Sequence, residues 1–145
     1  MIDLYTWTTP NGRKISILLE ELCVRYTVHP IDISKDEQFQ PSFLKISPNN
    51  RIPAIVDHET GIQLMETGAI MMYLAKKYSK FQCEGDEYWR MVEWLMWQMG
   101  GLGPMLGQVH HFSKYNKGKS DYSEIRYSKE SKRLYGVLNL SLIHI

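Results

Sequence analysis

The order of predicted elements in the first eighty residues constrains the fold more than any other feature of this chain. Residues 2–7 are β-branched and aromatic, and they end at a run of turn-forming residues, 8–12. From Arg13 onward apolar residues recur at helical spacing, and residues 26–33 alternate well enough for a second strand. Because a helix separates these two strands, a parallel, right-handed crossover is favoured.

A second pair of strands is expected after a polar segment. Residues 36–48 contain one short helical patch around Phe43, but a loop-like connection is the better interpretation of this segment. Residues 52–65 predict an antiparallel hairpin with its turn at 59–61. A helix opens directly after the hairpin and runs to about Tyr78. The sequence therefore predicts a small mixed sheet with helices on its faces.

The remainder of the chain shows a purely helical pattern. Residues 80–85 break the periodicity and are the expected linker between a domain at residues 1–79 and a helical part at residues 86–145. Apolar residues recur at spacings of three and four before residue 100 and again over 121–140. The glycine-rich run at 100–104, which includes a proline, predicts a kink or a close helix contact.

Charge and composition narrow the function classes. The chain has 145 residues, with 17 Lys and Arg against 16 Asp and Glu, so its formal charge of +1 attracts neither nucleic acid nor anionic lipid. The hydrophobic fraction of 43% suits a packed core. No basic leader begins the chain and no apolar run is long enough to span a bilayer, so the expected location is cytoplasmic, with no nucleic-acid or membrane partner.

Cysteines and histidines give no sign of a metal or redox centre within the chain. Cys23 and Cys83 form no CxxC pair, so they are expected to be buried or idle thiols. His110 and His111 are adjacent, and neighbouring side chains on a helix point about 100° apart, which is the wrong geometry for two ligands of one ion. No metal is expected.

Four segments carry a resemblance to a known family. They are residues 9–16 (TPNGRKIS), 46–57 (ISPNNRIPAIVD), 66–70 (ETGAI) and 97–108 (WQMGGLGPMLGQ). Together they resemble the nu class of the glutathione transferase superfamily, bacterial disulfide-bond oxidoreductases that use glutathione, from Met1 to about Asn139. The resemblance implies an α/β thioredoxin-like domain with a mixed four-stranded sheet, followed by an all-α glutathione-transferase domain that is incomplete here.

The resemblance also implies thiol–disulfide exchange, a reaction that needs a thiolate nucleophile. The turn where a thioredoxin-like protein usually carries its reactive cysteine contains none in this chain, so bound glutathione would supply the thiolate. Thr9 and Asn11 are then implied to be the catalytic residues that orient the sulfur. On spacing alone, both would simply shape a turn and cap a helix. Tyr5, whose hydroxyl is another candidate activator, is expected in the core.

Further residues are implied to bind glutathione, either reduced or oxidised, as a cosubstrate. Ile52 would pair its backbone with the cysteinyl part of glutathione if Pro53 is cis, whereas a trans proline that opens an edge strand is the plainer alternative. Glu66 and Thr67 would take the ammonium and the carboxylate of the γ-glutamyl group at a helix start. A simple N-cap is the structural alternative for Thr67.

Three more side chains complete the implied site. Gln38 would contact glutathione, and Arg51 would neutralise its glycyl carboxylate. Arg133 matches an arginine that the family brings to the glutathione site from its helical domain. Side chains of these types are mostly solvated surface in proteins, and that alternative stays open for each of them.

The expected function is the glutathione-dependent reduction of small disulfides by a homodimer. Two alternatives remain: a conjugating glutathione transferase that acts on electrophiles, and a non-catalytic glutathione-binding regulatory module. After Asn139 the family pattern gives way to an apolar finish at residues 140–145 (LSLIHI), which is interpreted as a truncated or spliced reading frame.

Overall fold

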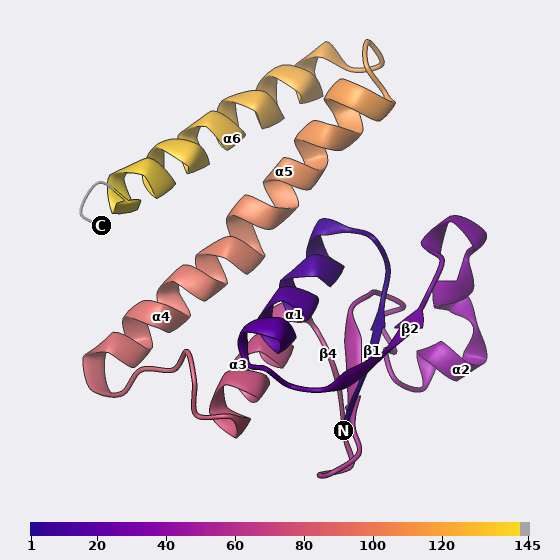
Figure 1. Cartoon of the computed structure of the whole chain (residues 1–145). Helices are drawn as coiled ribbons and strands as arrows, with labels where there is room; N and C mark the ends of the chain where they lie inside the picture. Colours follow the sequence, from indigo (N-terminus) through magenta and orange to yellow (C-terminus); the bar gives the residue numbers. More distant parts are fainter. Residues whose placement is uncertain (143–145) are drawn as a thin grey trace. The chain divides into compact units, whose positions relative to one another are not determined.

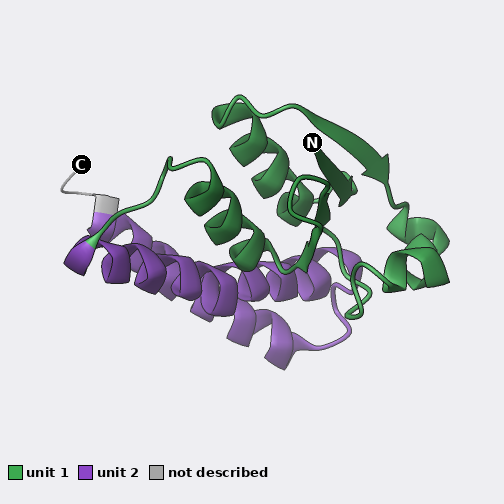
Figure 2. Ribbon diagram, turned by 90° about the horizontal axis from the view of Figure 1, so that it is seen from below, with its two compact units in different colours: residues 1–84 green, residues 85–145 purple. Residues whose placement is uncertain are grey.

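The computed structural model describes residues 1–142, which divide into two compact units (Figures 1 and 2). The first unit is Met1–Glu84, and the second begins at Gly85. Of the apolar finish at residues 140–145, the last three residues lie outside the described part of the chain. Each unit is a separate structural body with its own packing.

The first unit contains the four-stranded mixed sheet that the sequence predicts. The strands lie in the order β2-β1-β3-β4, with β1 and β2 parallel and the other two pairs antiparallel. The strands and longer helices are β1 (Ile2–Thr6), α1 (Pro10–Glu21), β2 (Tyr26–Pro30), β3 (Ala54–Asp57), β4 (Ile62–Met65) and α3 (Thr67–Lys77). A strand-helix-strand unit followed by a hairpin and a helix is the expected thioredoxin-like arrangement.

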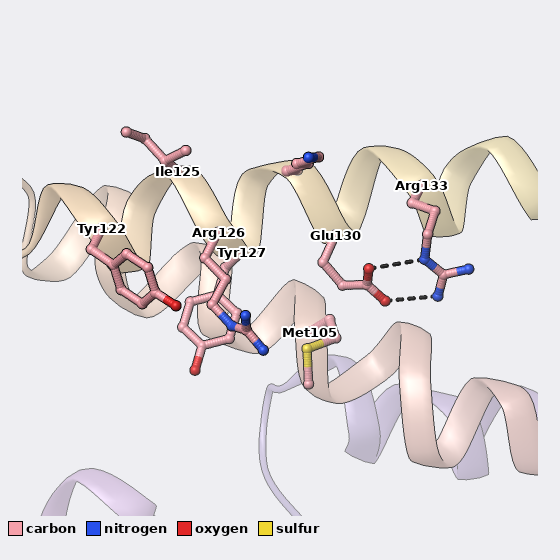
Figure 3. A pocket seen from close by; sticks show the side chains of 8 residues that line it. Met105, Tyr122, Ile125, Arg126, Tyr127, Glu130 and Arg133 are labelled. Atoms are coloured by element: carbon pink, nitrogen blue, oxygen red, sulfur yellow. Dashed lines mark hydrogen bonds and ion pairs between the residues drawn. The ribbon is translucent and has the colours of Figure 1, made fainter.

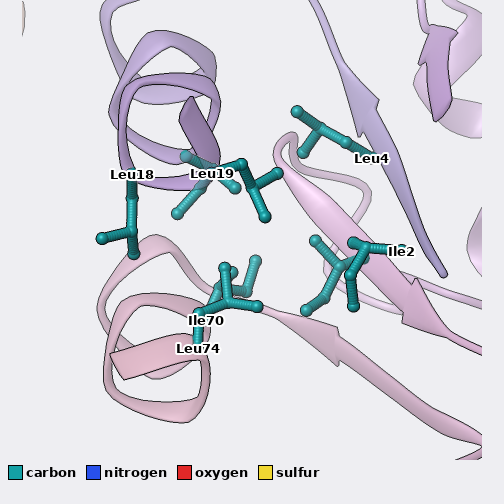
Figure 4. Close-up of a cluster of buried hydrophobic side chains, with 8 residues drawn as sticks. Ile2, Leu4, Leu18, Leu19, Ile70 and Leu74 are labelled. Carbon is teal, nitrogen blue, oxygen red and sulfur yellow. The ribbon is translucent and has the colours of Figure 1, made fainter. Parts of the chain in front are cut away.

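The core of this unit lies between α1, α3 and one face of the sheet (Figure 4). Ile2 and Leu4 of β1 point to this face together because successive side chains of a strand alternate. They meet apolar side chains that recur on one face of each helix. The buried cluster consists of Ile2, Leu4, Ile15, Leu18, Leu19, Ile55, Ile70 and Leu74.

Helix α1 begins three residues earlier than its apolar spacing predicts. Pro10 opens the helix, where its missing N–H is no loss, and Thr9 is the N-cap. Gly12 was expected in the turn but lies inside the helix. A Cβ at Gly12 would lie 2.2 Å from Thr6 Oγ1 and 2.5 Å from the Trp7 carbonyl oxygen. Glycine therefore allows the start of α1 to lie directly against the end of β1.

The connection after β2 is more ordered than the loop that the sequence predicts. The strand expected over residues 26–33 ends at Pro30, which has no N–H to continue a ladder. Asp32 then starts a helical turn by accepting a hydrogen bond from the Ser34 N–H at 3.0 Å. The connection contains two 3₁₀ helices, Ile33–Lys35 and Glu37–Phe39, and the short helix α2 (Pro41–Leu44).

Tyr5 packs on the opposite face of the sheet, against this connection. Its ring stacks on that of His29 with centroids 4.7 Å apart, and it lies 6.2 Å from the ring of Phe43 in α2. Burial, together with the nearby negative charge of Asp3, raises the pKa of the Tyr5 hydroxyl. A phenol in this environment is a poor source of phenolate.

The second unit is built from three α-helices among its described residues. They are α4 (Gly85–Trp97), α5 (Gly103–His110) and α6 (Asp121–Leu142). The predicted glycine-rich interruption forms a π-helical turn, Gln98–Leu102, where a Cβ on Gly101 would lie 3.7 Å from Cδ2 of Leu134 in α6. A second π-helical turn, His111–Tyr115, follows α5. Within residues 1–142, no helix combines the length and apolar character needed to cross a membrane.

Candidate functional site

The strand register brings the predicted site residues of the first unit to one edge of the sheet. Tyr5 of β1 pairs with Ala54 of β3, and Ala54 pairs with Met65 of β4. The segments that follow β1, precede β3 and follow β4 therefore leave the sheet at the same edge. The parallel strand β2 also ends there, since Pro30 pairs with Thr6. We call this the site edge.

The turn after β1 presents a hydroxyl and an amide at the start of α1. Thr9 Oγ1 accepts a hydrogen bond from the Gly12 N–H at 3.2 Å, as an N-cap does. This bond does not use the hydrogen of the Thr9 hydroxyl, which can be donated to another acceptor. Asn11 is exposed in the first turn, where the helix dipole adds a partial positive charge. Capping and anion binding are compatible roles for this turn.

Lys14 contacts this turn and was not found by the sequence analysis. Its Nζ donates a hydrogen bond to Asn11 Oδ1 at 3.1 Å. Because the amide oxygen is engaged by lysine, the Asn11 Nδ2 group is left as the donor. Burial lowers the pKa of Lys14. The spacing of three residues on a helix was the signal that could have identified this pair.

The loop before β3 is fixed from inside by Ser47. This fully buried side chain donates to the Arg51 carbonyl oxygen at 2.8 Å and accepts from the Arg51 N–H at 3.4 Å. The Ile52–Pro53 peptide bond that follows is cis, one of the two alternatives left open by the sequence. Pro53 is buried, whereas the Arg51 side chain is exposed. The loop thus carries an exposed cation next to the backbone of Ile52.

The residues after β4 begin helix α3 at the same edge. Glu66 is the N-cap, with a φ of 71°, and its carboxylate accepts a hydrogen bond from Asn49 Nδ2 at 3.3 Å. Thr67 is the first helical residue and is 7% exposed, so the interpretation of Thr67 as the N-cap is wrong. The first N–H groups of α3 have no acceptor within the helix, which makes this end attractive to a carboxylate.

Gln38 lies in the connection that leaves the site edge after β2. Its Nε2 donates to Asp36 Oδ1 at 3.3 Å. Its Oε1 is shielded from solvent and has no hydrogen-bond partner in residues 1–142. Gln38 is therefore held by its own segment, and no hydrogen bond of the described chain joins it to Thr9, Asn11 or Glu66.

Arg133 belongs to α6 of the second unit. Its Nε and Nη2 donate to the Glu130 carboxylate at 2.9 and 2.7 Å (Figure 3). These bonds raise the pKa of Arg133 and leave its Nη1 group unengaged by Glu130. The pair lines a pocket of about 580 Å³ with Met105, Tyr122, Ile125, Arg126, Tyr127 and Lys129.

Both cysteines are exposed and unpaired, so of the two expected alternatives, buried or idle thiols, the buried one is wrong. Cys23 follows α1 and has a φ of 56°, a left-handed turn at the end of the helix. Cys83 follows α3 near the end of the first unit. Helices α1 and α3 both start at the site edge, so each cysteine follows the far end of its helix. No group of three or more His, Cys, Asp or Glu residues in the described chain is arranged to hold a metal ion.

The groups at the site edge fit a small thiol that carries both an ammonium and carboxylates. Thr9 and Asn11 offer donors at the positive end of α1, where a thiolate is stabilised. The carboxylate of Glu66 suits an ammonium, and the start of α3 suits a carboxylate. These features define a thioredoxin-like fold whose first turn carries no cysteine and whose site edge offers spare donors and acceptors to a ligand.

Comparison with known proteins identifies the family. The family model described as "Glutathione S-transferase, N-terminal domain" matches residues 1–76. In addition, the Escherichia coli protein named disulfide-bond oxidoreductase YfcG is 49% identical over 148 residues, which cover 98% of this chain and 69% of that protein. The chain belongs to the glutathione S-transferase family.

Solved structures of similar proteins contain glutathione. A glutathione transferase from Pseudomonas putida, with one glutathione disulfide bound per subunit, is 41% identical with a TM-score of 0.91, over 99% of this chain and 65% of that one. A family member from Pseudomonas fluorescens pf-5, with two glutathione bound, is 45% identical with a TM-score of 0.89, over 94% and 63%. The chain thus spans slightly less than two thirds of these two solved proteins.

Proposed function

We propose that this chain binds glutathione at the site edge and uses the glutathione thiolate to reduce small disulfides. The observation that carries the proposal is the Thr9 hydroxyl, whose oxygen accepts from the Gly12 N–H while its hydrogen stays available for a thiolate. Asn11 adds an amide donor at the same helix start. The turn has no cysteine, and similar proteins have been solved with glutathione or its disulfide, which supports an external thiol as the nucleophile.

The other groups of the site edge suit the remaining parts of glutathione. The Glu66 carboxylate would accept from the γ-glutamyl ammonium, and the N–H groups at Thr67 would donate to the γ-glutamyl carboxylate. The Ile52 backbone, ahead of the buried Pro53, would pair with the cysteinyl unit in the manner of an added strand. The exposed Arg51 would neutralise the glycyl carboxylate.

Two predicted contacts come from outside these groups. Gln38 would reach glutathione from the connection after β2, where its amide already bonds to Asp36. Arg133 would offer its Nη1 group to a carboxylate while Glu130 holds the rest of the guanidinium. Both remain proposals for the glutathione-bound protein.

The proposed reduction consists of two thiol–disulfide exchanges. The thiolate of bound glutathione attacks one sulfur of the substrate disulfide, the S–S bond breaks, and the second substrate sulfur leaves as a thiolate that takes up a proton. A second glutathione thiolate then attacks the glutathione sulfur of the mixed disulfide and releases the other substrate thiol. Two glutathione thiols are oxidised to one glutathione disulfide, so no other reductant is needed. Thr9 and Asn11 favour the attacking thiolate by donating hydrogen bonds to it.

Two model substrates test this proposal against its alternatives. We expect the chain to turn over 2-hydroxyethyl disulfide with glutathione, followed as formation of glutathione disulfide, faster than it conjugates chlorodinitrobenzene. The reverse order would favour a conjugating transferase. Retention on immobilised glutathione without turnover of either substrate would favour a non-catalytic binding module, and failure to bind glutathione at all would refute the proposal.

The assembly and the compartment are also proposals. Helix α4 exposes three large apolar side chains, Trp89, Trp94 and Met96, at 68, 39 and 48%. Trp89 and Met96 are seven residues apart and so share one face of the helix, and aromatic and Met side chains are enriched in protein interfaces, so we expect this face of α4 to contact a second copy in a homodimer. Light scattering should give twice the 17.0 kDa chain mass. Two exposed, unpaired cysteines suit the reducing cytoplasm.

A further inference from the structure

We propose that Asn49 is a positioning residue that holds the Glu66 carboxylate ready for the ammonium of a γ-glutamyl substrate. The inference rests on the proposed function, because it concerns how the same site recognises glutathione. It adds a residue that does not itself need to touch the ligand. The substrate class it selects is a γ-glutamyl thiol with a free α-ammonium.

A hydrogen bond joins Asn49 to Glu66, which lies seventeen residues further along the chain. Asn49 Nδ2 donates to Glu66 Oε1 at 3.3 Å, and both residues are exposed. A free glutamate samples many rotamers, and ordering such a side chain costs conformational entropy. A carboxylate that is already held by one oxygen has less rotational freedom to lose when an ammonium binds to the other.

The loop that carries Asn49 is held in place by hydrogen bonds of Ser47. Ser47 is fully buried and bonds to both backbone groups of Arg51, and the Asn50 N–H donates to the Ser47 carbonyl oxygen at 2.9 Å. Ser47 Oγ also lies 3.9 Å from Sδ of Met65, the residue just before Glu66. The loop is therefore anchored to itself and to the end of β4, so Asn49 is presented from a fixed frame.

The group that donates to Glu66 is the neutral side-chain amide of Asn49. An amide satisfies one oxygen of Glu66 and leaves the full negative charge of the carboxylate in place. A lysine or arginine at position 49 would neutralise that charge and compete with the ligand ammonium. The loop that carries Asn49 continues to Ile52. It therefore connects the residue that orients Glu66, the proposed partner of the γ-glutamyl ammonium, with the backbone proposed to pair with the cysteinyl unit.

The test compares two ligands that differ by one group, using isothermal titration of the full chain. Glutathione has the α-ammonium, and glutaryl-cysteinylglycine lacks it while keeping the same carboxylates and thiol. We expect Asn49→Ala to weaken glutathione binding by roughly 3- to 10-fold, less than the loss of a direct hydrogen bond to a charged group, because Asn49 acts on the ligand only through Glu66. Binding of the glutaryl analogue should stay within about twofold, because no ammonium is involved.

Three controls separate positioning from a general effect on the loop. Asn49→Leu keeps the side-chain shape without the donor and should reproduce Asn49→Ala. Asn50→Gly is the matched control, since Asn50 has a φ of 46° that glycine adopts readily, and it should leave both ligands unchanged. In a Glu66→Gln background, Asn49→Ala should have no further effect on glutathione, because the two residues act through one contact.

The outcomes are distinct. Equal weakening of both ligands by Asn49→Ala would show a structural role for the loop and overturn the proposal, as would unchanged glutathione binding. If the unaltered chain binds glutathione, these results leave the proposed function standing. If the unaltered chain does not bind glutathione, the proposed function fails and the inference fails with it.

Discussion

The two edges of the sheet in the first unit differ in how far their polar groups are paired with one another. At the edge away from the site, which we call the closed edge, Asp57 is fully buried and accepts hydrogen bonds from Tyr73 at 2.5 Å and from Lys77. Lys77 also pairs with Glu59 at 2.8 Å, and the Tyr73 hydroxyl lies 2.9 Å from that of Thr60. Every charged group of this cluster has an internal partner.

The site edge leaves binding capacity unused. The Thr9 hydroxyl oxygen accepts a hydrogen bond from Gly12, but its hydrogen is not donated to a group of the described chain. The Asn11 side-chain oxygen accepts from Lys14, and its Nδ2 hydrogens remain available as donors. Glu66 is bonded through one oxygen to Asn49. Polar groups that satisfy one another stabilise the fold, whereas groups held in place with spare donors and acceptors can bind a ligand. Substitutions at the two edges should therefore affect different measurements.

The largest expected effect is on stability at the closed edge. Asp57→Ala removes a buried carboxylate and leaves Tyr73 and Lys77 without their shared acceptor, so the free energy of unfolding should fall by about 3 to 5 kcal/mol. Urea unfolding followed by circular dichroism measures the change. Asp57→Asn keeps the side-chain volume and should lose less. A loss below about 1 kcal/mol for the alanine variant would show that the network does not hold this edge together.

A second prediction concerns acid. Burial raises the pKa of Asp57, but the hydrogen bonds from Lys77 and Tyr73 outweigh it and lower the pKa from 3.8 to about 2. A lowered carboxyl pKa contributes stability that is complete above pH 3.8 and is lost as the pH falls toward 2. The contribution is roughly 2 kcal/mol. Between pH 5 and pH 2 the unaltered protein should lose that much more stability than Asp57→Asn, as measured by urea unfolding at each pH. Parallel losses in the two proteins would contradict the assignment.

At the site edge the expected effect is on turnover. Replacing Thr9 and Asn11 together by alanine removes both proposed donors to the sulfur, so the rate of 2-hydroxyethyl disulfide reduction should fall well over tenfold. Stability should fall by about 1 kcal/mol, because the N-cap is lost. Thr9→Ser keeps the cap and the hydroxyl and is the matched control. Unchanged turnover in the double variant would remove these residues from the mechanism.

The sheet and its topology could be predicted from sequence because the signals are long and local. The apolar spacing of α1 and the hairpin turn at 59–61 identify the elements, and the crossover rule fixes β1 and β2 as parallel. The segment from Ile33 to Leu44 could not be predicted as well. Its helices are three or four residues long, so no periodic pattern distinguishes them, and the Asp32 cap and the burial of Phe43 determine where they form.

The site was only partly accessible to the same reasoning. Thr9 and Asn11 stand in a recognisable turn before a helix, so their residue types and position suggest a cap or an anion site. Asn49 could not be found in this way, because its contact with Glu66 depends on how a loop and a helix start meet in space. The register of β3 and β4 brings them together, and sequence spacing alone does not encode that distance.

The smallest expected effect tests whether the donors of the site edge are themselves oriented. Lys14→Met keeps the side-chain length but removes the hydrogen bond that orients the Asn11 amide. Disulfide reduction should therefore slow by roughly 2- to 5-fold, a smaller effect than the loss of a hydrogen bond to a charged group. Lys14→Arg retains a donor and should remain near the unaltered rate. In an Asn11→Ala background, Lys14→Met should change nothing further, because lysine acts through that amide. An additional loss in that background would mean that the Lys14 charge acts on the thiolate directly, and the pH profile of turnover would then shift upward with the thiol pKa.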